Sequence, residues 1–288
     1  LEYKNDAIGK GIRSTLGVEQ ESNIGFYIAV FDGKAITRTD MSAEKDNILK
    51  TIYLKEVVDD YIAEVDVEGR KLNHRYACSG IDGITLAPDI ERPNSKKKYI
   101  YVAYGIYGDT ARTDNDYQII LKYDISKWNK WSRVLMQDEL HRSGPRKPSG
   151  KYFVKTGNTT FGIQNLEYDF SSQNFYAAVY AGRKSTYPNY TLFLIDGSTQ
   201  PIKRNINFYG KPQTIKTLSL HASGNYDAAT GVRGWHFPWG STGIFPLGDS
   251  LFYISHNMKE SDGQQSSTLY KYRWTGDNKN PFILIHKH

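Results

Sequence analysis

Three polar side chains stand at matching places in the sequence, and their types suit hydrolytic or sugar-binding chemistry. Asp82, Gln164 and Thr242 are the third residues of Gly-Ile-Asp, Gly-Ile-Gln and Gly-Ser-Thr, each at the head of an apolar segment, and Asn165 follows Gln164. An aspartate can act as a general base, while amide and hydroxyl groups hold the hydroxyls of a ligand. We expect a ligand funnel formed by Asp82, Gln164, Asn165 and Thr242. Alternatively, these side chains satisfy free backbone groups where strands begin.

A second carboxylate would be needed for acid and base catalysis with Asp82. Glu167 and Asp169 follow Gln164 in the sequence, Glu167 inside the predicted strand Ile163–Tyr168 and Asp169 just after it. Two carboxyl groups about 5 to 10 Å apart are the arrangement that glycoside hydrolysis requires. Glu167, or Asp169 in its place, is therefore the candidate acid.

His141 and Arg142 lie in a long basic stretch from residue 136 to residue 160. Histidine exchanges protons near neutral pH, and arginine binds a carboxylate or phosphate with two parallel hydrogen bonds. Together they suit a lyase, in which His141 abstracts the proton α to a uronate and Arg142 neutralises its carboxylate. The alternative is a solvent-exposed basic loop.

Trp235, His236 and Trp239 come just before the third apolar segment, in the stretch GWHFPWG. Flat aromatic rings at the mouth of a channel can stack on sugar faces, which makes these three residues candidate substrate contacts. Buried tryptophans at the edge of a sheet would give the same sequence pattern.

Asp109, Asp114 and Asp116 bring three carboxylates into an eight-residue stretch. Carboxylates are hard oxygen ligands, so these residues are a candidate calcium site, although their spacing does not match an EF-hand loop. The alternative is a turn whose aspartates cap backbone groups, with Arg112 paired to one of them.

The elements that would position these residues recur with a period of roughly 80 residues, which is typical of repeat architectures. The middle copy predicts strands at Ile163–Tyr168, Phe175–Tyr180 and Tyr190–Ile195, separated by turns. Short repeated antiparallel strands favour an all-β fold and, within it, a β-propeller, for which five blades fit best and four to six are compatible. We expect residues 1–288 to form a single propeller domain, with residues 1–23 as an N-terminal arm or ring-closing strand.

The N-terminal quarter predicts further strands. Gly25–Val30 and Ala35–Arg38 read as a hairpin, and Leu49–Val58 and Tyr61–Val67 as two strands around a pair of aspartates. A helix is indicated only at Ser42–Lys50, where Ser42 could act as the cap.

Charge, hydropathy and cysteine content argue against several classes of partner and site. The net charge is +6 with a pI of about 9.0, and the excess is spread along the chain without a nucleic-acid-binding motif, so nucleic acid is not expected as a partner. No apolar stretch is long enough for a membrane span. Cys78 is the only cysteine and is expected to be a small core residue, not a nucleophile.

The sequence starts at Leu1, which suggests a removed signal and a secreted or cell-surface location. It indicates no oligomeric state.

The whole pattern resembles the five-bladed propeller glycoside hydrolases of the arabinanase and fructosidase type. Those families have an aspartate base at the start of an inner strand, which Asp82 in GIDGIT matches, and a glutamate acid on a later blade, for which Glu167 is the candidate. Several segments, HRSGP among them, also resemble those of uncharacterised bacterial proteins. The resemblance implies a secreted bacterial enzyme, a glycoside hydrolase or polysaccharide lyase, acting on a glycan that could be acidic. The alternative is a non-catalytic propeller that binds a glycan or a protein partner.

Overall fold

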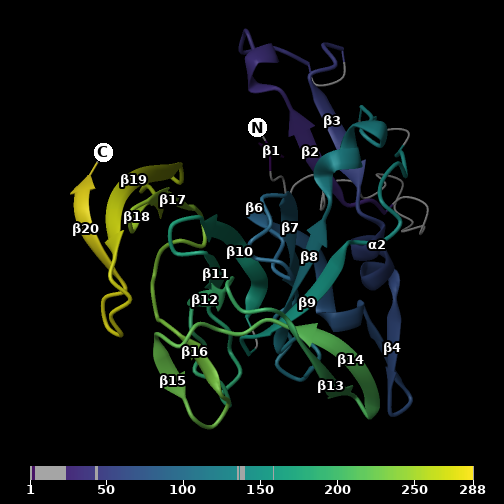
Figure 1. Ribbon diagram of the computed structural model, residues 1–288, viewed down its shortest axis with the longest axis vertical. Coiled ribbons are helices and arrows are strands. Elements are labelled where there is room, and N and C mark those ends of the chain that lie inside the picture. The colour runs from purple at the N-terminus through teal and green to yellow at the C-terminus, as the bar shows by residue number, and fades with distance from the viewer. Residues whose placement is uncertain are drawn as a thin grey trace.

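The computed structural model describes residues 2–3, 24–42, 45–134, 136, 140–157 and 159–287. These residues form mostly β-strands with one short α-helix, so the prediction of an all-β protein is confirmed (Figure 1). Of the predicted arm or ring-closing strand at residues 1–23, only β1 (Glu2–Tyr3) is described, and it pairs with β2. The rest of that prediction lies outside the described residues.

Four sheets with three or more strands make up the described part of the chain, together with two separate hairpins. The first sheet, the N-terminal sheet, contains β1, β2 (Tyr27–Phe31) and β3 (Leu49–Tyr53). The second sheet has six strands, in the spatial order β13 (Ile202–Phe208), β14 (Lys211–Thr217), β9 (Gly150–Lys155), β8 (Tyr117–Tyr123), β7 (Lys98–Ile106) and β6 (Cys78–Pro88). The third contains β10 (Thr160–Asp169), β11 (Asn174–Tyr180) and β12 (Leu192–Asp196), and the fourth β17 (Ile244–Gly248), β18 (Leu251–Lys259), β19 (Gln265–Trp274) and β20 (Phe282–Lys287). The hairpins are β4 (Glu64–Val67) with β5 (Arg70–Asn73), and β15 (Asn225–Asp227) with β16 (Val232–Gly234).

The three sequence repeats each produce an antiparallel meander, as predicted. Their first strands are β6, β10 and β17; β10 contacts both β6 and β17. In the view of Figure 1 the sheets follow one another from the N-terminal sheet through the six-stranded sheet to the C-terminal sheet. The repeat therefore brings the three polar positions onto neighbouring strands.

Apolar cores lie between successive sheets, and the central strands contribute to two cores at once. On β7, Val102 and Tyr104 enter the core shared with the first sheet, whereas Tyr101 and Ala103 enter the core shared with β10–β12. Successive residues of a strand point to opposite faces. A strand that is buried on both faces therefore needs an almost continuous apolar run, and YIYVAYGI is such a run.

The sheet β10–β12 repeats this arrangement one step further along the chain. Phe175 of β11 packs toward the six-stranded sheet, and Tyr176 packs toward the C-terminal sheet beside Phe252 and Phe282. Two neighbouring residues of one strand thus join two different cores. Each sheet is therefore held against the next by the apolar core between them.

One helix replaces part of the two strands predicted at Leu49–Val58 and Tyr61–Val67. Strand β3 ends at Tyr53, and α2 (Lys55–Ile62) follows before β4 begins. Val57, Val58 and Tyr61 are buried at helical spacing, which two short strand patterns also accommodate. No side chain caps the helix, so its start carries no sequence signal.

Two further N-terminal predictions were wrong. β2 pairs with β1 and β3, and not with Ala35–Arg38, because a 3₁₀ turn at Gly33–Ala35 leads the chain away. At Ser42 the structure has a capped turn, in which Lys45 N donates to Ser42 Oγ and Asp46 N donates to Ser42 O. Strand β3 then begins at Leu49, inside the predicted helix.

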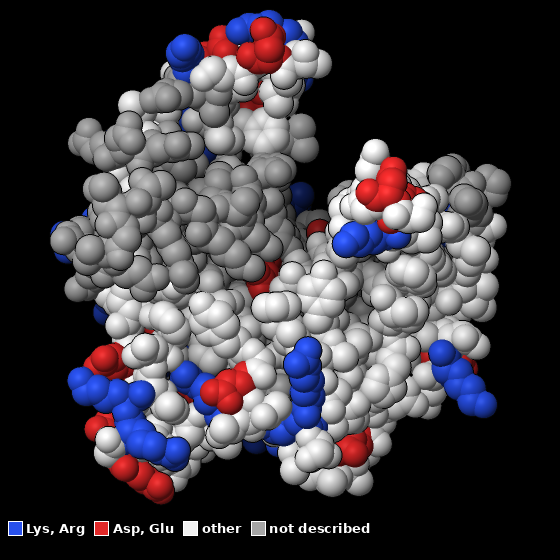
Figure 2. Space-filling view, turned by 180° about the vertical axis from the view of Figure 1, so that it is seen from behind, with Lys and Arg blue, Asp and Glu red and all other residues white. Residues whose placement is uncertain are grey.

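Cys78 is fully buried in the first core, as predicted, and burial raises the pKa of its thiol. In the described part of the chain no helix has the length and apolar character to cross a membrane. On the face drawn in Figure 2, basic side chains alternate with acidic ones and do not gather in one patch.

Candidate functional site

Two of the predicted polar residues, Asp82 and Gln164, contact each other, and Asn165 contacts the segment that precedes β17. Gln164 Nε2 donates a hydrogen bond of 2.9 Å to Asp82 Oδ2, which joins β10 to β6. Asn165 Nδ2 donates to the carbonyl oxygens of Gly240 and Ser241 at 2.8 and 2.7 Å. The sequence repeat thus predicted the neighbourhood of these side chains.

Asp82, Gln164, Asn165 and Thr242, which we call the polar line, mainly hold the structure together. Asn165 satisfies two backbone carbonyl groups just before β17, which is the alternative considered from the sequence. Thr242 is exposed, and its hydroxyl forms a hydrogen bond of 3.0 Å with the hydroxyl of Ser255 on the same sheet. Asp82 is only 4% exposed, so its carboxylate is not open to solvent.

Glycines near the start of the copies allow a backbone conformation and close contacts that a side chain would disturb. Gly162 has φ +83°, and a Cβ at this position would lie 2.6 Å from the carbonyl oxygen of Tyr104. A Cβ on Gly105 would lie 2.6 Å from Asp82 Oδ2, so this glycine makes room for the carboxylate. The three repeat glycines, Gly80, Gly162 and Gly240, share a positive φ of +131°, +83° and +95°, a backbone conformation that favours glycine.

The three inner strands also enclose a cavity of about 660 Å³ near their other ends, which we call the inner-strand cavity. Its walls include Thr85 of β6, Glu167 of β10 and Phe245 of β17. Thr85 Oγ1 accepts from Tyr168 N at 3.1 Å and donates to Glu167 Oε2 at 3.4 Å. Phe170, also in the wall, is 54% exposed and Phe245 58%. Large exposed aromatic rings beside a carboxylate make this the most ligand-like hollow of the inner strands.

The predicted acid and base do not share this cavity. Glu167 lines it, whereas Asp82 is buried outside it, on the neighbouring strand beside Gln164. Asp169 lines the cavity, but its oxygens accept hydrogen bonds from Ser171 and Ser172 in the turn that follows. Burial alone would raise the pKa of Asp169, but these hydrogen bonds outweigh it and the pKa is lowered. The geometry thus favours Glu167 as the candidate acid in this cavity.

His141 and Arg142 lie elsewhere, against the N-terminal sheet. The His141 ring packs edge-on against Tyr27, and its Nε2 is hydrogen-bonded to Thr51 Oγ1 at 2.8 Å. Burial and the charge of Arg133 lower the pKa of His141. Neither His141 nor the exposed Arg142 is among the residues of the inner-strand cavity. Their arrangement supports a structural role for His141.

The three aromatic candidates have different surroundings. Trp235 is 1% exposed, packs edge-on against Trp274 and donates from Nε1 to the Asp277 carbonyl oxygen at 3.0 Å. It is a core residue and cannot stack on a ligand. His236 is exposed beside Tyr190. Trp239 is half-buried, and its ring lies parallel to that of His256 with 3.6 Å between the ring centroids.

This Trp239–His256 stack predicts a pH-dependent stability. Burial lowers the pKa of His256, so the folded state favours the neutral ring. The stabilisation is present above the unfolded pKa of about 6.5 and is lost as the pH falls through and below that value. A neutral ring can accept a hydrogen bond at Nε2 from the Tyr272 hydroxyl, 2.9 Å away, whereas an imidazolium cannot.

We therefore expect His256→Phe to lose less thermal stability than the wild type between pH 7.5 and pH 5, measured by circular dichroism. His141 titrates in the same direction in both proteins, so the difference between them is the informative quantity. His236→Phe, on the exposed loop, is the matched control and should follow the wild type. Parallel curves for the wild type and His256→Phe would contradict the expectation.

The three predicted calcium ligands do not converge. Asp114 is paired with Arg112 at 2.8 Å and Asp116 with Lys184 at 2.6 Å, while Asp109 caps the backbone N of Ala111. Among the described residues, no group of three or more His, Cys, Asp or Glu side chains is arranged to hold a metal ion. The calcium prediction is not supported, because separate cations and backbone groups already occupy these carboxylates.

Comparison with known proteins gives no match to a protein-family model, to a curated protein or to a solved structure. The resemblance to propeller glycoside hydrolases therefore stays a prediction.

Proposed function

We propose that the chain is a β-propeller that binds a glycan in the inner-strand cavity without cleaving it. The propeller is supported by the sheets in series, each sharing a core with the next, and by the neighbouring first strands of the three repeats. Four sheets of three or more strands are candidates for blades in the described residues. The count of five blades stays a prediction.

The observation that carries the binding proposal is the mixed chemistry of the cavity wall. Phe170 and Phe245 present large exposed ring surfaces, and Glu167 and Thr85 place an acceptor and a hydroxyl between them. Sugars combine an apolar C–H face with a rim of hydroxyls, so they match a wall of this kind.

Binding is favoured over catalysis because the candidate base and acid do not both face the inner-strand cavity. Asp82 is buried and bonded to Gln164, and Asp169 caps a turn, so neither is placed to act with Glu167 across the cavity. Both mechanisms of glycoside hydrolysis need a pair of carboxyl groups flanking the bond. Elimination through His141 would need that residue in the cavity wall, of which it is not a part.

The first test is isothermal titration calorimetry of the wild type, Phe245→Ala and Glu167→Gln against neutral and acidic oligosaccharides. We expect Phe245→Ala to weaken binding about fivefold, because an aromatic contact is worth about 1 kcal/mol. Phe161→Ala is the matched control, since Phe161 is a similarly exposed ring at the opposite end of β10.

Product analysis of the same mixtures separates binding from turnover. Unchanged oligosaccharides with the wild type support binding alone. Cleavage by the wild type that is lost in Glu167→Gln would instead establish the enzyme, with Glu167 as its acid. Equal affinity of Phe245→Ala and the wild type, or no binding by either, would refute the inner-strand cavity as the glycan site.

A further inference from the structure

The C-terminal sheet has one packed face and one open face. Phe252 and Ile254 of β18 lie on the packed face, in the core shared with β10–β12. Successive residues of a strand point to opposite faces, so the neighbours of these two residues lie on the other face. Among the described residues, the three cores that join the four sheets include no residue of this other face. We call it the open face; it contains Phe245, Leu251, Tyr253, Leu269, Lys271, Arg273 and Ile283.

A row of side chains crosses the open face and begins at the inner-strand cavity. Phe245 of β17 is directly opposite Tyr253 of β18, and Tyr253 is directly opposite Lys271 of β19. Opposite residues of antiparallel strands place their side chains on the same face, about 5 Å apart. Phe245 also lines the inner-strand cavity. The row therefore leads from the cavity over two strand spacings, roughly 10 Å, to Lys271.

Two cations stand at the outer end of this row. Lys271 is half-buried, and Arg273, two residues further along β19 and on the same face, is exposed. Neither side chain forms an ion pair with a described residue. Strands β17, β18, β19 and β20 contain no aspartate or glutamate, because the acidic residues of this part of the chain are in turns. The open face is therefore cationic.

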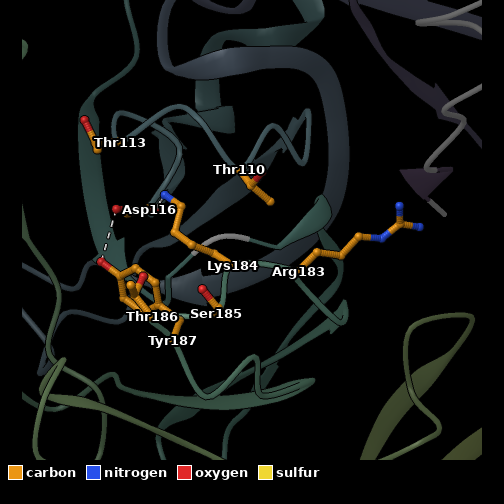
Figure 3. Close-up of a pocket in the computed structure, with 8 residues that line it drawn as sticks. All are labelled: Thr110, Thr113, Asp116, Arg183, Lys184, Ser185, Thr186 and Tyr187. Atoms are coloured by element: carbon orange, nitrogen blue, oxygen red, sulfur yellow. Dashed lines mark hydrogen bonds and ion pairs between the residues drawn. The ribbon is translucent and has the colours of Figure 1, made fainter.

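Lys184 gives the contrasting case of a cation that is already paired. It lines a second cavity, of about 490 Å³, between the loops at residues 107–116 and 181–190, and Figure 3 shows Lys184 and Tyr187 turned toward Asp116. Lys184 Nζ donates to Asp116 Oδ1 at 2.6 Å, and the Tyr187 hydroxyl donates to Oδ2 at 3.1 Å. The two cations of the open face have no such carboxylate, so their charge can attract an anionic ligand.

The inner-strand cavity itself does not suit an anionic sugar. Glu167 and Asp169 are the only charged residues that line it. Burial alone would raise the pKa of Asp169, but its hydrogen bonds with Ser171 and Ser172 outweigh burial and lower the pKa, so this carboxylate is charged at neutral pH. A second negative charge close to it is repelled. A neutral sugar therefore fits the cavity, and an acidic sugar fits the cations of the open face.

We propose that the ligand is an acidic glycan chain that extends from the inner-strand cavity along this row of the open face. A neutral sugar lies in the cavity on Phe245, and the carboxylate or sulfate of a sugar further along the chain binds Lys271 and Arg273. This inference rests on the proposed glycan binding in the cavity and adds the charge and length of the ligand. An acidic ligand was expected from the sequence, but on His141 and Arg142, which lie against the N-terminal sheet.

The test uses isothermal titration calorimetry with three probes: the hyaluronan hexasaccharide, in which glucuronate alternates with a neutral sugar, the neutral chitohexaose, and glucuronate alone. We expect the hyaluronan hexasaccharide to bind about tenfold more tightly than chitohexaose at low salt, with a smaller difference in about 0.5 M salt, because salt screens exposed charges. Glucuronate should bind more weakly than the hexasaccharide, because one sugar cannot occupy the cavity and reach the cations.

The double variant Lys271→Gln with Arg273→Gln should weaken binding of the hyaluronan hexasaccharide about tenfold at low salt and leave chitohexaose unchanged. Lys259→Gln is the matched control. Lys259 is exposed on the same face, but it lies on β18 at a distance of roughly 20 Å from Tyr253 and the row. It removes the same kind of charge and should bind like the wild type. Thermal melts establish that each variant is folded.

Preference for the hyaluronan hexasaccharide that is lost in the double variant and kept in Lys259→Gln supports the proposal. Equal affinity for the two hexasaccharides, or equal affinity of the double variant and the wild type for hyaluronan, would overturn the acidic extension and leave the inner-strand cavity as a neutral glycan site. Glucuronate that binds as tightly as the hexasaccharide would overturn the extended chain. Phe245→Ala that binds both hexasaccharides like the wild type, or no binding of any glycan, would instead refute the cavity and the extension together.

Discussion

Trp235→Ala is expected to lower the free energy of unfolding by about 3–5 kcal/mol, the usual cost of truncating a large buried aromatic side chain. The Trp235 ring is almost fully buried in the core between β10–β12 and the C-terminal sheet, against Trp274. Its backbone is also hydrogen-bonded to Leu192 of β12, and its Nε1 to the carbonyl oxygen of Asp277. The substitution thus removes apolar contacts and leaves that carbonyl without its donor. Urea denaturation followed by tryptophan fluorescence and circular dichroism measures the loss.

Trp239→Ala is the matched control for Trp235→Ala. Trp239 lies four residues further along the same loop, but it is half-buried and its stacking partner is a single histidine, His256. Its loss should cost about 1 kcal/mol. Equal destabilisation by the two substitutions would contradict the core role of Trp235.

The contrast between the two tryptophans shows what the sequence can reveal about this loop. GWHFPWG contains two tryptophans in the same polar and glycine-containing context, and nothing in the spacing tells which ring points inward. The difference arises from pairing, because the backbone of Trp235 bonds to Leu192 and continues the sheet. Such pairing joins residues about forty positions apart and leaves no local pattern.

The polar line could be predicted, because its residues follow a pattern that is visible in the sequence. Its members stand at matching places in three copies of one unit, so the repeat was enough to predict that Asp82 lies beside Gln164. Phe245 and Phe170, in contrast, occupy different positions in their copies and entered no prediction. The repeat predicts the register of the strands, but each copy has its own side chains at the cavity.

Helix α2 was missed because its burial pattern is short. Val57, Val58 and Tyr61 cover little more than one helical turn, and valine and tyrosine favour strands. The helix is stabilised by tertiary contacts instead: Lys151 of β9 forms ion pairs with Glu56 and Asp60. Tertiary contacts of this kind routinely override local propensity.

Asp114→Ala is also expected to destabilise the fold by about 3–5 kcal/mol, the typical cost of breaking a buried ion pair by removing one partner. Asp114 is 2% exposed and accepts hydrogen bonds from Arg112 Nε, Tyr76 N and the Tyr209 hydroxyl, each at 2.9 Å. Without the carboxylate, the Arg112 guanidinium, itself in a residue only 6% exposed, loses its counter-charge. Thermal and urea denaturation of the variant measure the loss.

Asp109→Ala provides the matched control, because Asp109 belongs to the same loop but caps a backbone N in an exposed turn. Its loss should cost about 1 kcal/mol or less. A chelator distinguishes the ion pair from a calcium site, since a bound ion would stabilise the folded state in proportion to the logarithm of its concentration. If the ion pair with Arg112 is what Asp114 provides, the melting temperature of the wild type should be the same with calcium and with EDTA. A melting temperature that rises with calcium in the wild type but not in Asp114→Ala would restore the metal site, because only a carboxylate that reaches the ion can couple its binding to folding.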